Sequence, residues 1–470
     1  MNRSVLLTAC ILLLINLGCG HQDGQHQRGN ATNLYVILNV SVLPMTDKDT
    51  LLSNVNVVIR DHRIESINGP IPDSATRIDG TNKWLLPGFI DMHVHGFADI
   101  NFGTPYPTQG ATFFVDDQDV MTLYLANGVT TIFDLNARVE NFAQRNAIQK
   151  GRIIGPRMAL AALINGGDGD GRIANNPEDG RQSVRMAKAE GYEFIKVYSQ
   201  LDEETFLAIV DEANRQHMKV VGHIPNSFIG KTQKAFVPGF NLVAHAEEFA
   251  KQSKTYGDDD IQSFVSMAKA SGTWLCPTLI TIKRIRDQTQ SLDSIRHLQG
   301  FELIHPLMQD KWINANKFND GSNNQDTRHL AELMDFNNRL VKAFYQANIP
   351  LVTGTDAGCS GVVWGYALHD ELALLVQAGL SPKDALKSST ILPAKWLGID
   401  HLIGTIEPGK FADLVLLNSN PMEDIHHTRN IYGVFANGQW LPQSMLKQMT
   451  DTVRTHHQKM GDRRKTVQMN

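Results

Sequence analysis

Eight short apolar runs, most of them separated by helical patterns, restrict the folds open to this chain more than any other feature. The intervening segments, such as VDDQDVMTLYLANG and LDEETFLAIVDEANRQ, have the apolar spacing of amphipathic helices. Strands that alternate with helices pair in parallel, and eight such units predict an α/β fold, a TIM-like (β/α)8 barrel. Its active site is expected at the C-terminal ends of the strands. The runs are FIDMHVH (89–95), VTTIFDL (129–135), RMALAALI (157–164), FIKVY (194–198), KVVGHI (219–224), LVAHA (242–246), TWLCPTL (273–279) and IPLVTGTD (349–356).

Two β-rich segments bracket the barrel. Residues 34–86 and 403–442 contain short alternating runs such as VNVVIRDHRIESI and IYGVFANGQWL, with turn residues between them. We expect both chain ends to form one small β-sandwich domain, which leaves residues 87–402 for the barrel. The long connection from 280 to 349 has helical patterns and predicts ordered helices. The residue pattern of 443–470 predicts a C-terminal helix followed by a tail.

The N-terminus has the anatomy of an export signal. In residues 1–19, Arg3 precedes an apolar run of about a dozen residues, which is too short to span a bilayer comfortably. The run ends at Cys19, and Leu17-Gly18-Cys19 resembles the lipobox of bacterial lipoproteins. We therefore expect a signal peptide over residues 1–19 and a polar tether over residues 20–33.

The lipobox assignment has one competitor. A lipobox usually has leucine three places before the cysteine, where this chain has Asn16, and LLTAC at Cys10 fits that pattern better. Cys10, however, has almost no apolar segment ahead of it, so Cys19 is favoured. The expected location is that of an exported bacterial lipoprotein, periplasmic or anchored to the outer membrane.

Charge and cysteine content narrow the classes of partner and of site. The 470 residues include 44 basic and 49 acidic ones, with a net charge of -5 and no long run of one sign. This excludes the electrostatic footprint of a nucleic-acid-binding protein and favours small molecules or peptides as partners. Membrane contact is expected only through the lipid anchor, and assembly into an oligomer is left open. If Cys10 is removed and Cys19 is lipidated, Cys276 and Cys359 remain, so a metal must use nitrogen and oxygen ligands.

Metal-binding side chains stand at the ends of five of the eight runs. The first run carries two histidines, His93 and His95, which point to the same side of a strand. A lone histidine at a strand end is usually a hydrogen-bonded structural residue, and an aspartate before Ala-Gly is often a helix cap. Their joint occurrence at one rim of a barrel favours a metal site instead. The other members are Lys196, His223, His245 and Asp356.

This order of residues resembles the amidohydrolase superfamily, and within it the imidazolonepropionase-related, prolidase-like branch. The resemblance covers about residues 34–440, and its most specific motifs are PGFIDMHVH, TGTDAG and GTIEPGKFADLVLL. It implies metal-dependent hydrolysis on a barrel with a small β domain. Two departures concern the substrate more than the metal: GFAD follows the first motif, and HAEE places acids after His245 where many relatives place one before it.

The resemblance also implies a ligand set for two Zn²⁺ ions per chain. His93, His95 and Asp356 would hold the first metal, and His223 and His245 the second. Lys196 would react with carbon dioxide to form N6-carboxylysine and bridge the two metals, because a protonated lysine would repel cations. Imidazole nitrogen and carboxylate oxygen are donors that suit zinc.

The expected reaction is hydrolysis of C–N (amide) bonds in small peptides, N-acyl amino acids or cyclic amides. Metal binding lowers the pKa of a coordinated water from 15.7 to roughly 7, and Asp356 would shuttle its proton to the leaving nitrogen. Tyr198, two places after Lys196, is a candidate substrate-binding residue, although a packed rim tyrosine explains it equally well. For Glu247 and Glu248, an exposed acidic loop is the preferred interpretation, and His369 is expected to cap or support rather than to bind metal.

Two other functions stay open at this stage. The first is a mononuclear deaminase or cyclic-amide hydrolase that uses His93, His95, His223 and Asp356, with Lys196 uncarboxylated. The second is an exported binding lipoprotein without catalysis, because a fold does not dictate a function.

Overall fold

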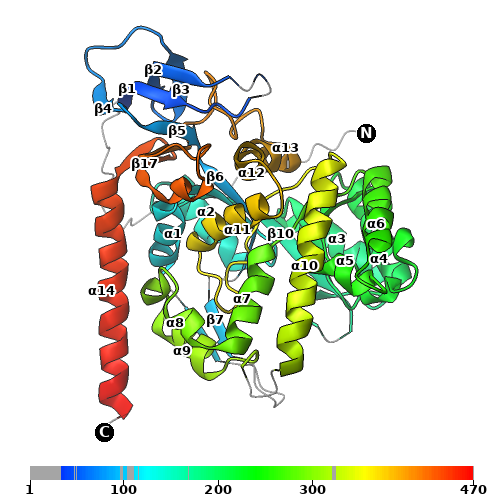
Figure 1. Cartoon of the computed structure of the whole chain (residues 1–470). Coiled ribbons are helices and arrows are strands. Elements are labelled where there is room, and N and C mark those ends of the chain that lie inside the picture. The colour runs from blue at the N-terminus through cyan, green and yellow to red at the C-terminus, as the bar shows by residue number, and fades with distance from the viewer. Residues whose placement is uncertain are drawn as a thin grey trace, which may run out of the picture. The chain divides into compact units, whose positions relative to one another are not determined.

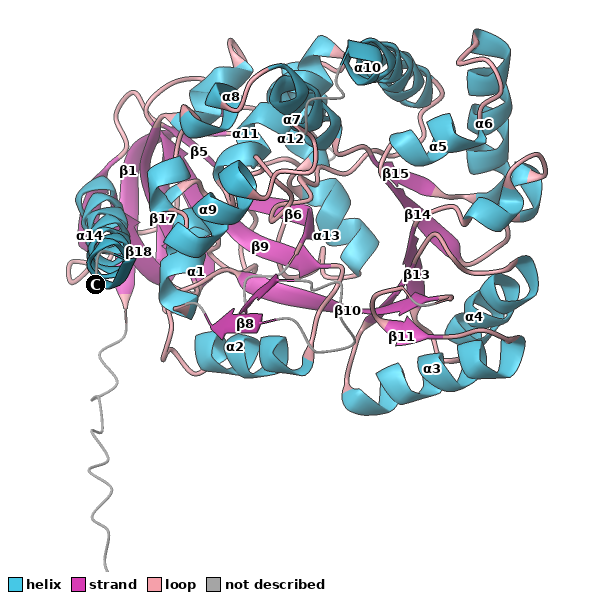
Figure 2. Ribbon diagram, turned by 90° about the horizontal axis from the view of Figure 1, so that it is seen from below, coloured by secondary structure: helices cyan, strands magenta, loops and turns pink. Residues whose placement is uncertain are grey.

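The barrel strands occur where the apolar runs predict them. The computed structural model describes residues 33–46, 48, 50–95, 99–102, 111–114, 116–167, 169–319 and 324–468. Seven of the predicted runs form one parallel sheet in the order β15-β14-β13-β12-β10-β9-β6, with β11 (Arg172–Ile173) paired to β10 (Figure 2). The strands are β6 (Phe89–Val94), β9 (Val129–Asp134), β10 (Arg157–Asn165), β12 (Phe194–Val197), β13 (Lys219–Gly222), β14 (Phe240–Ala244) and β15 (Trp274–Cys276).

The eighth run closes the barrel between β15 and β6 through single bridges instead of a regular ladder. Residues 350–357 pair with β15 at Leu275↔Leu351 and with β6 at Val94↔Ala357. The amide of Met92 donates to the carbonyl of Thr353 at 2.9 Å, and the amide of Asp356 donates to that of His93 at 2.7 Å. A Cβ at Gly354 would stand 2.4 Å from the sulfur of Cys276, so only glycine lets this segment approach its neighbours.

Helices cover the outside of the parallel sheet, and their ends follow local sequence signals. In α3 (Pro177–Glu190), Asn176 accepts a hydrogen bond from the amide of Asp179, Pro177 takes the first turn, and Gly191 ends the helix with φ 97°. Only short 3-10 turns, η1 (Asn226–Phe228) and η2 (Thr232–Lys234), connect β13 to β14. The other helices up to β15 are α1 (Asp117–Ala126), α2 (Val139–Gln149), α4 (Glu203–Arg215), α5 (Glu247–Gln252) and α6 (Asp258–Ser271), and a hairpin of β7 (Asp99–Phe102) and β8 (Ala111–Phe114) precedes α1.

Strands from both chain ends form a second, mixed sheet, as the sequence predicts. Its order is β18-β17-β16-β5-β1-β2-β3, with β4 paired to β1. β5 pairs parallel with β1 and antiparallel with β16, so the N-terminal and C-terminal strands meet within one sheet (Figure 1). The strands are β1 (Leu34–Val42), β2 (Leu52–Arg60), β3 (Arg63–Ile67), β4 (Thr76–Asp79), β5 (Trp84–Pro87), β16 (Leu414–Leu417), β17 (Ile431–Ala436) and β18 (Gln439–Pro442).

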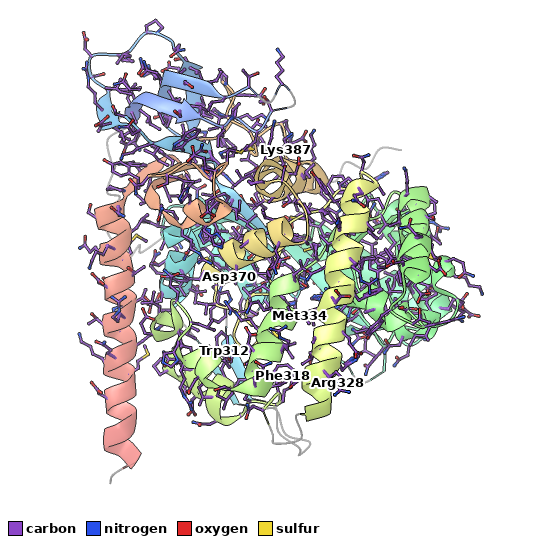
Figure 3. The ribbon with its side chains drawn as sticks, in the orientation of Figure 1. Trp312, Phe318, Arg328, Met334, Asp370 and Lys387 are labelled. Atoms are coloured by element: carbon purple, nitrogen blue, oxygen red, sulfur yellow. The ribbon has the colours of Figure 1, made fainter. Side chains whose placement is uncertain are left out.

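The long connection before the eighth run is helical, as expected. Trp312 of α9 (Pro306–Asn314) stacks on Trp364 with ring centroids 6.2 Å apart. Asp370 of α11 (Tyr366–Gln377) forms ion pairs with Arg284 of α7 (Leu279–Gln290) and Arg429 of η4 (Ile425–Arg429). Trp312 and Asp370 are labelled in Figure 3. Among the described residues, no helix combines the length and apolarity that a membrane span needs. The remaining elements are α7 (Leu279–Gln290), α8 (Asp293–Arg296), η3 (Phe301–Leu303), α9 (Pro306–Asn314), α10 (Asn324–Gln346), α11 (Tyr366–Gln377), α12 (Pro382–Ser388), α13 (Ile391–Leu397), η4 (Ile425–Arg429) and α14 (Gln443–Gln468).

The predicted signal peptide, Cys19 and most of the tether lie outside the described residues, and export and lipid anchoring stay predictions. The segment GFA (96–98), which follows the histidine pair, also lies outside them.

An aromatic cluster packs inside the barrel, with Phe194 at the start of β12 and Phe133 near the end of β9. The rings of Phe133 and Phe194 lie 4.8 Å apart, and Trp396 of α13 stacks on Phe194 at 5.4 Å. All three side chains are buried and pack with Ala161, Val221 and other residues of the same apolar cluster. The barrel is therefore a packed core and not a channel.

We expect Trp396→Ala to lower the free energy of unfolding by roughly 3–5 kcal/mol, because it removes a buried aromatic ring and leaves a cavity. Urea denaturation followed by circular dichroism measures the change. Val139→Ala is the control, since Val139 is 68% exposed and its truncation removes no core packing. Equal stability of the two variants would contradict this account of the barrel core.

Candidate metal centre

His93, His95 and Asp356 converge at the C-terminal end of β6. The two Nε2 atoms lie 2.9 Å apart, and Asp356 Oδ1 lies 3.3 Å from His93 Nε2 and 3.0 Å from His95 Nε2. Side chains alternate between the two faces of a strand, so histidines two residues apart lie on the same side. Barrel closure brings the aspartate to them, because the Asp356 amide bonds to the His93 carbonyl.

Asp91 connects the histidine strand to the aspartate segment. Its carboxylate accepts hydrogen bonds from the Thr355 amide at 3.0 Å, from the Thr355 hydroxyl at 2.6 Å and from the His93 amide at 3.2 Å. Burial raises the pKa of Asp91 to about 7 despite these bonds. Our sequence analysis missed this residue, although Asp91, His93 and His95 alternate along one strand and therefore face the same side.

His223 and His245 extend the cluster across the barrel mouth. The ring centroids of His93 and His245 lie 4.6 Å apart, and those of His245 and His223 lie 5.0 Å apart. A hydroxyl contacts one nitrogen of each ring: Thr278 Oγ1 lies 2.7 Å from His245 Nδ1, and Ser199 Oγ lies 2.7 Å from His223 Nδ1. Such contacts fix the ring orientation and direct the other nitrogen elsewhere, as in histidine ligands of metals.

Lys196 is fully buried at the end of β12, and its Nζ has no hydrogen-bond partner in the described part of the chain. Its charge lowers the pKa values of His93 and His223, after the larger effect of their burial, so it lies within electrostatic reach of the histidines. Burial also lowers the pKa of Lys196 itself to about 8, which increases the share of neutral amine.

Tyr198 packs on a histidine of the cluster. Its ring centroid lies 4.1 Å from that of His223, with the planes 31° apart. Burial raises the pKa of Tyr198 to about 12, so its hydroxyl stays protonated at neutral pH. The residue lies at the predicted place, and the packing contact accounts for its ring.

The expectation of an exposed acidic loop is wrong for Glu248. This side chain is fully buried, and its Oε1 lies 3.1 Å from His223 Nδ1. Its other oxygen accepts a hydrogen bond from the Ile224 amide at 3.2 Å, and Lys251 lies 2.5 Å from Oε1. The reason is local: α5 starts two residues after His245, and its first turn packs against the segment that follows β13 instead of reaching solvent.

The backbone is left-handed at three residues of this cluster. The φ angles are 78° at His245, 48° at Thr278 and 59° at Asp356, and none of these residues is glycine. Such conformations cost of order 1–3 kcal/mol each and persist where the surroundings impose them. His245 and Thr278 follow β14 and β15, and Asp356 is the last residue of the eighth run, so all three stand where the chain leaves the barrel.

The residues fit a metal site. Three buried polar atoms without hydrogen-bond partners in the described part of the chain gather here, namely His93 Nδ1, His223 Nε2 and Lys196 Nζ. Burial alone would raise the pKa of Asp356, but the contact with His95 and the other nearby cationic groups keep this pKa below its usual value. A carboxylate beside imidazole nitrogens is a donor set for a divalent cation such as Zn²⁺.

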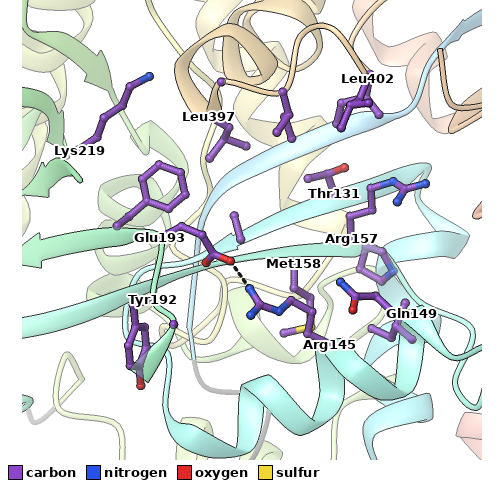
Figure 4. Close-up of a pocket in the computed structure, with 18 of the residues that line it drawn as sticks. Thr131, Arg145, Gln149, Arg157, Met158, Tyr192, Glu193, Lys219, Leu397 and Leu402 are labelled. Atoms are coloured by element: carbon purple, nitrogen blue, oxygen red, sulfur yellow. Dashed lines mark hydrogen bonds and ion pairs between the residues drawn. The ribbon is translucent and has the colours of Figure 1, made fainter. Parts of the chain in front are cut away.

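Other residues from the sequence analysis lie outside the cluster. His369 of α11 is buried, and its Nδ1 lies 2.9 Å from the Thr428 hydroxyl, which agrees with a supporting role. Cys276 and Cys359 are both free thiols. A cavity of about 620 Å³ lies at the opposite, N-terminal end of β10, β12 and β13, and none of the predicted ligands lines it (Figure 4).

Comparisons with known proteins agree with this geometry. The adenine deaminase 2 of Jannaschia sp. is 31% identical over 105 residues, which are 21% of this chain and 16% of that protein. The ochratoxinase of Aspergillus niger is 23% identical over 390 residues, covering 73% of this chain and 71% of the relative. A crystal structure of a Xaa-Pro dipeptidase with bound methionine superposes with a TM-score of 0.65 at 21% identity, covering 87% of this chain and all of that one.

The family assignment rests on the larger part of the chain. Residues 84–441, from β5 through the barrel to β18, match the Amidohydrolase family. This range includes all six predicted ligands and the strands that carry them. The chain therefore belongs to the amidohydrolase family and is a hydrolase that acts on carbon–nitrogen bonds.

Proposed function

We propose that this enzyme hydrolyses amide bonds in small peptides, N-acyl amino acids or cyclic amides with two Zn²⁺ ions. The observation that carries the proposal is the convergence of His93, His95 and Asp356, whose ligand atoms lie within 4.8 Å of one another. The similar Xaa-Pro dipeptidase structure supports small peptides as a substrate class, because its name specifies a dipeptide.

The proposed ligand sets follow the sequence analysis. His93, His95 and Asp356 hold one ion, and His223 and His245 hold the other. When bound, such ions lower the pKa of water and polarise a carbonyl oxygen. Lys196 would supply a ligand to both ions as N6-carboxylysine, which forms when its neutral amine bonds to the carbon of CO₂ and releases one proton. The lowered pKa of Lys196 supports this step, because only the neutral amine has the electron pair it needs.

Asp356 is the proposed proton carrier. Its side chain is 13% exposed, and its Oδ1 lies 3.3 Å from His93 Nε2 and 3.0 Å from His95 Nε2, so the carboxylate is beside the proposed metal ligands and accessible from the barrel mouth. The carboxylate takes a proton from the water as the oxygen attacks the carbonyl carbon. It then donates that proton to the amine as the C–N bond breaks. Tyr198, whose hydroxyl stays protonated, is the proposed hydrogen-bond donor to the substrate.

Glu248 is a proposed positioning residue for His223. Carboxylates that contact the far nitrogen of a ligand histidine orient the ring and raise its basicity. Glu248 meets this description because its Oε1 lies 3.1 Å from His223 Nδ1 while His223 Nε2 has no other partner in the described residues.

We expect Lys196→Ala to lose the second metal and to reduce hydrolysis of a dipeptide panel by at least 100-fold, because the bridge between the sites is removed. Metal content per chain is measured by mass spectrometry beside the rate. Lys234→Ala, at an exposed lysine paired with Glu203, is the control. A Lys196→Ala protein with unchanged rate and one metal would favour a mononuclear site. The partial match to adenine deaminase 2 is the reason to test for this alternative, a mononuclear deaminase.

Glu248→Gln should weaken metal binding roughly 10- to 100-fold, since the glutamine keeps the size of the side chain but loses its charge. Competition with a chromogenic chelator measures the affinity without any assay of activity. Glu204→Gln, at an exposed position of α4, is the matched control. Unchanged affinity in Glu248→Gln would remove the positioning role and leave the metal site itself untouched.

A further inference from the structure

The cavity at the N-terminal end of the barrel strands has the size of a ligand site. Its volume of about 620 Å³ lies within the range of roughly 300–1,000 Å³ that small-molecule sites occupy. Residues at the starts of β10, β12 and β13 line it together with α2, the end of α3 and the segment after α13. Phe194 of the aromatic cluster lines this cavity, and Lys196 of the candidate metal centre follows it two residues later on β12.

One side of the cavity is apolar. Leu397 and Leu402 face it from α13 and the segment that follows, and Met158 lies on the opposite side (Figure 4). Leu402, Ile399 and Phe411 are only partly buried, so they present apolar surface to this space. Apolar surface of this kind is favourably covered by an apolar ligand.

The charged groups of the lining are mostly positive. Arg145, Arg157, Lys188 and Lys219 belong to the lining, and Glu193 is its only carboxylate among the described residues. Glu193 pairs with Arg145, and Asp413, which lies outside the lining, pairs with Arg157 at 2.5 Å. Burial lowers the pKa of Lys219, and the charge of Asp400, which also lies outside the lining, partly offsets this shift. The cations still outnumber all these carboxylates.

Two of the cations are held beside aromatic rings at the cavity. The Arg157 guanidinium lies 4.2 Å from the centroid of Phe411, and Lys219 Nζ lies 5.2 Å from that of Trp396. Lys219 donates a hydrogen bond to the Trp396 carbonyl and has no carboxylate within ion-pair distance in the described part of the chain. Its remaining donors are therefore available to an anion.

We propose that this cavity is a second binding site, separate from the catalytic one, for an amphipathic carboxylate such as a medium-chain fatty acid. The acyl chain lies against Leu397, Leu402 and Phe411, and the carboxylate accepts hydrogen bonds from Lys219 or displaces a carboxylate from an arginine. Charge complementarity supports an anion, and the apolar side supports a chain of several carbons. The site is separate from the metal centre, because none of the six predicted metal ligands lines this cavity.

Isothermal titration of the full-length protein with sodium decanoate, below its micelle concentration, tests the proposal. We expect saturable binding of one decanoate per chain in the micromolar range. Acetate supplies the charge without the chain, and decanol supplies the chain without the charge, so each should bind at least tenfold more weakly. Equal binding of decanol and decanoate would overturn the assignment to an anion.

Variants of the cavity locate the binding. Ala159→Phe fills the space from β10 and should weaken decanoate binding at least tenfold, and Lys219→Met should weaken it several-fold. Because Lys219 also contacts the end of α13, Leu402→Glu provides an independent variant that adds a repelling charge at a partly buried position. Lys234→Met is the control for the loss of a lysine elsewhere. Metal content and the unfolding temperature report whether each variant is folded.

The outcomes are distinct. Weaker binding by the three cavity variants, with normal metal content, supports the site. Full binding by Ala159→Phe and Leu402→Glu would overturn it. Anionic phosphatidylglycerol vesicles that bind the protein while free decanoate does not would also overturn it, because a membrane surface would then be the partner.

Discussion

The closure of the barrel by residues 350–357 is the constraint on which the rest of the structure depends. This segment accepts and donates hydrogen bonds to both β15 and β6, the last and first strands of the sheet. The bond from the Asp356 amide to the His93 carbonyl fixes the aspartate beside two imidazoles that lie more than 260 positions earlier in the sequence. Without closure, the ligands would sit on opposite edges of an open sheet.

Most of the fold could be predicted because its signals are local. Each apolar run is short and most are followed by a helix pattern or a turn, so the spacing of apolar residues and the turn residues between the runs identify the strands. The candidate ligands could be predicted for the same reason, since His93, Lys196 and Asp356 stand where their runs end. Resemblance to a family then supplied the roles that the spacing alone leaves open.

Most contacts that hold the ligands could not be predicted, because they join segments far apart in the sequence. Asp91 acts through Thr355, Ser199 contacts a histidine from the next strand, and Thr278 contacts one from the strand before it. Nothing in the local pattern of these residues indicates their partners. Glu248 was misjudged because a pair of acids at the start of a helix usually faces solvent, whereas α5 turns this one inward.

The left-handed residues at the mouth of the barrel have a consequence for the evolution of thermal tolerance. Glycine or asparagine at positions 245, 278 and 356 would relieve the conformational penalty, but each exchange would delete an imidazole, a hydroxyl or a carboxylate from the cluster. Selection for heat resistance therefore acts against function at these three places. Lineages adapted to hotter habitats should instead accumulate their stabilising changes in the outer helices and in the mixed sheet.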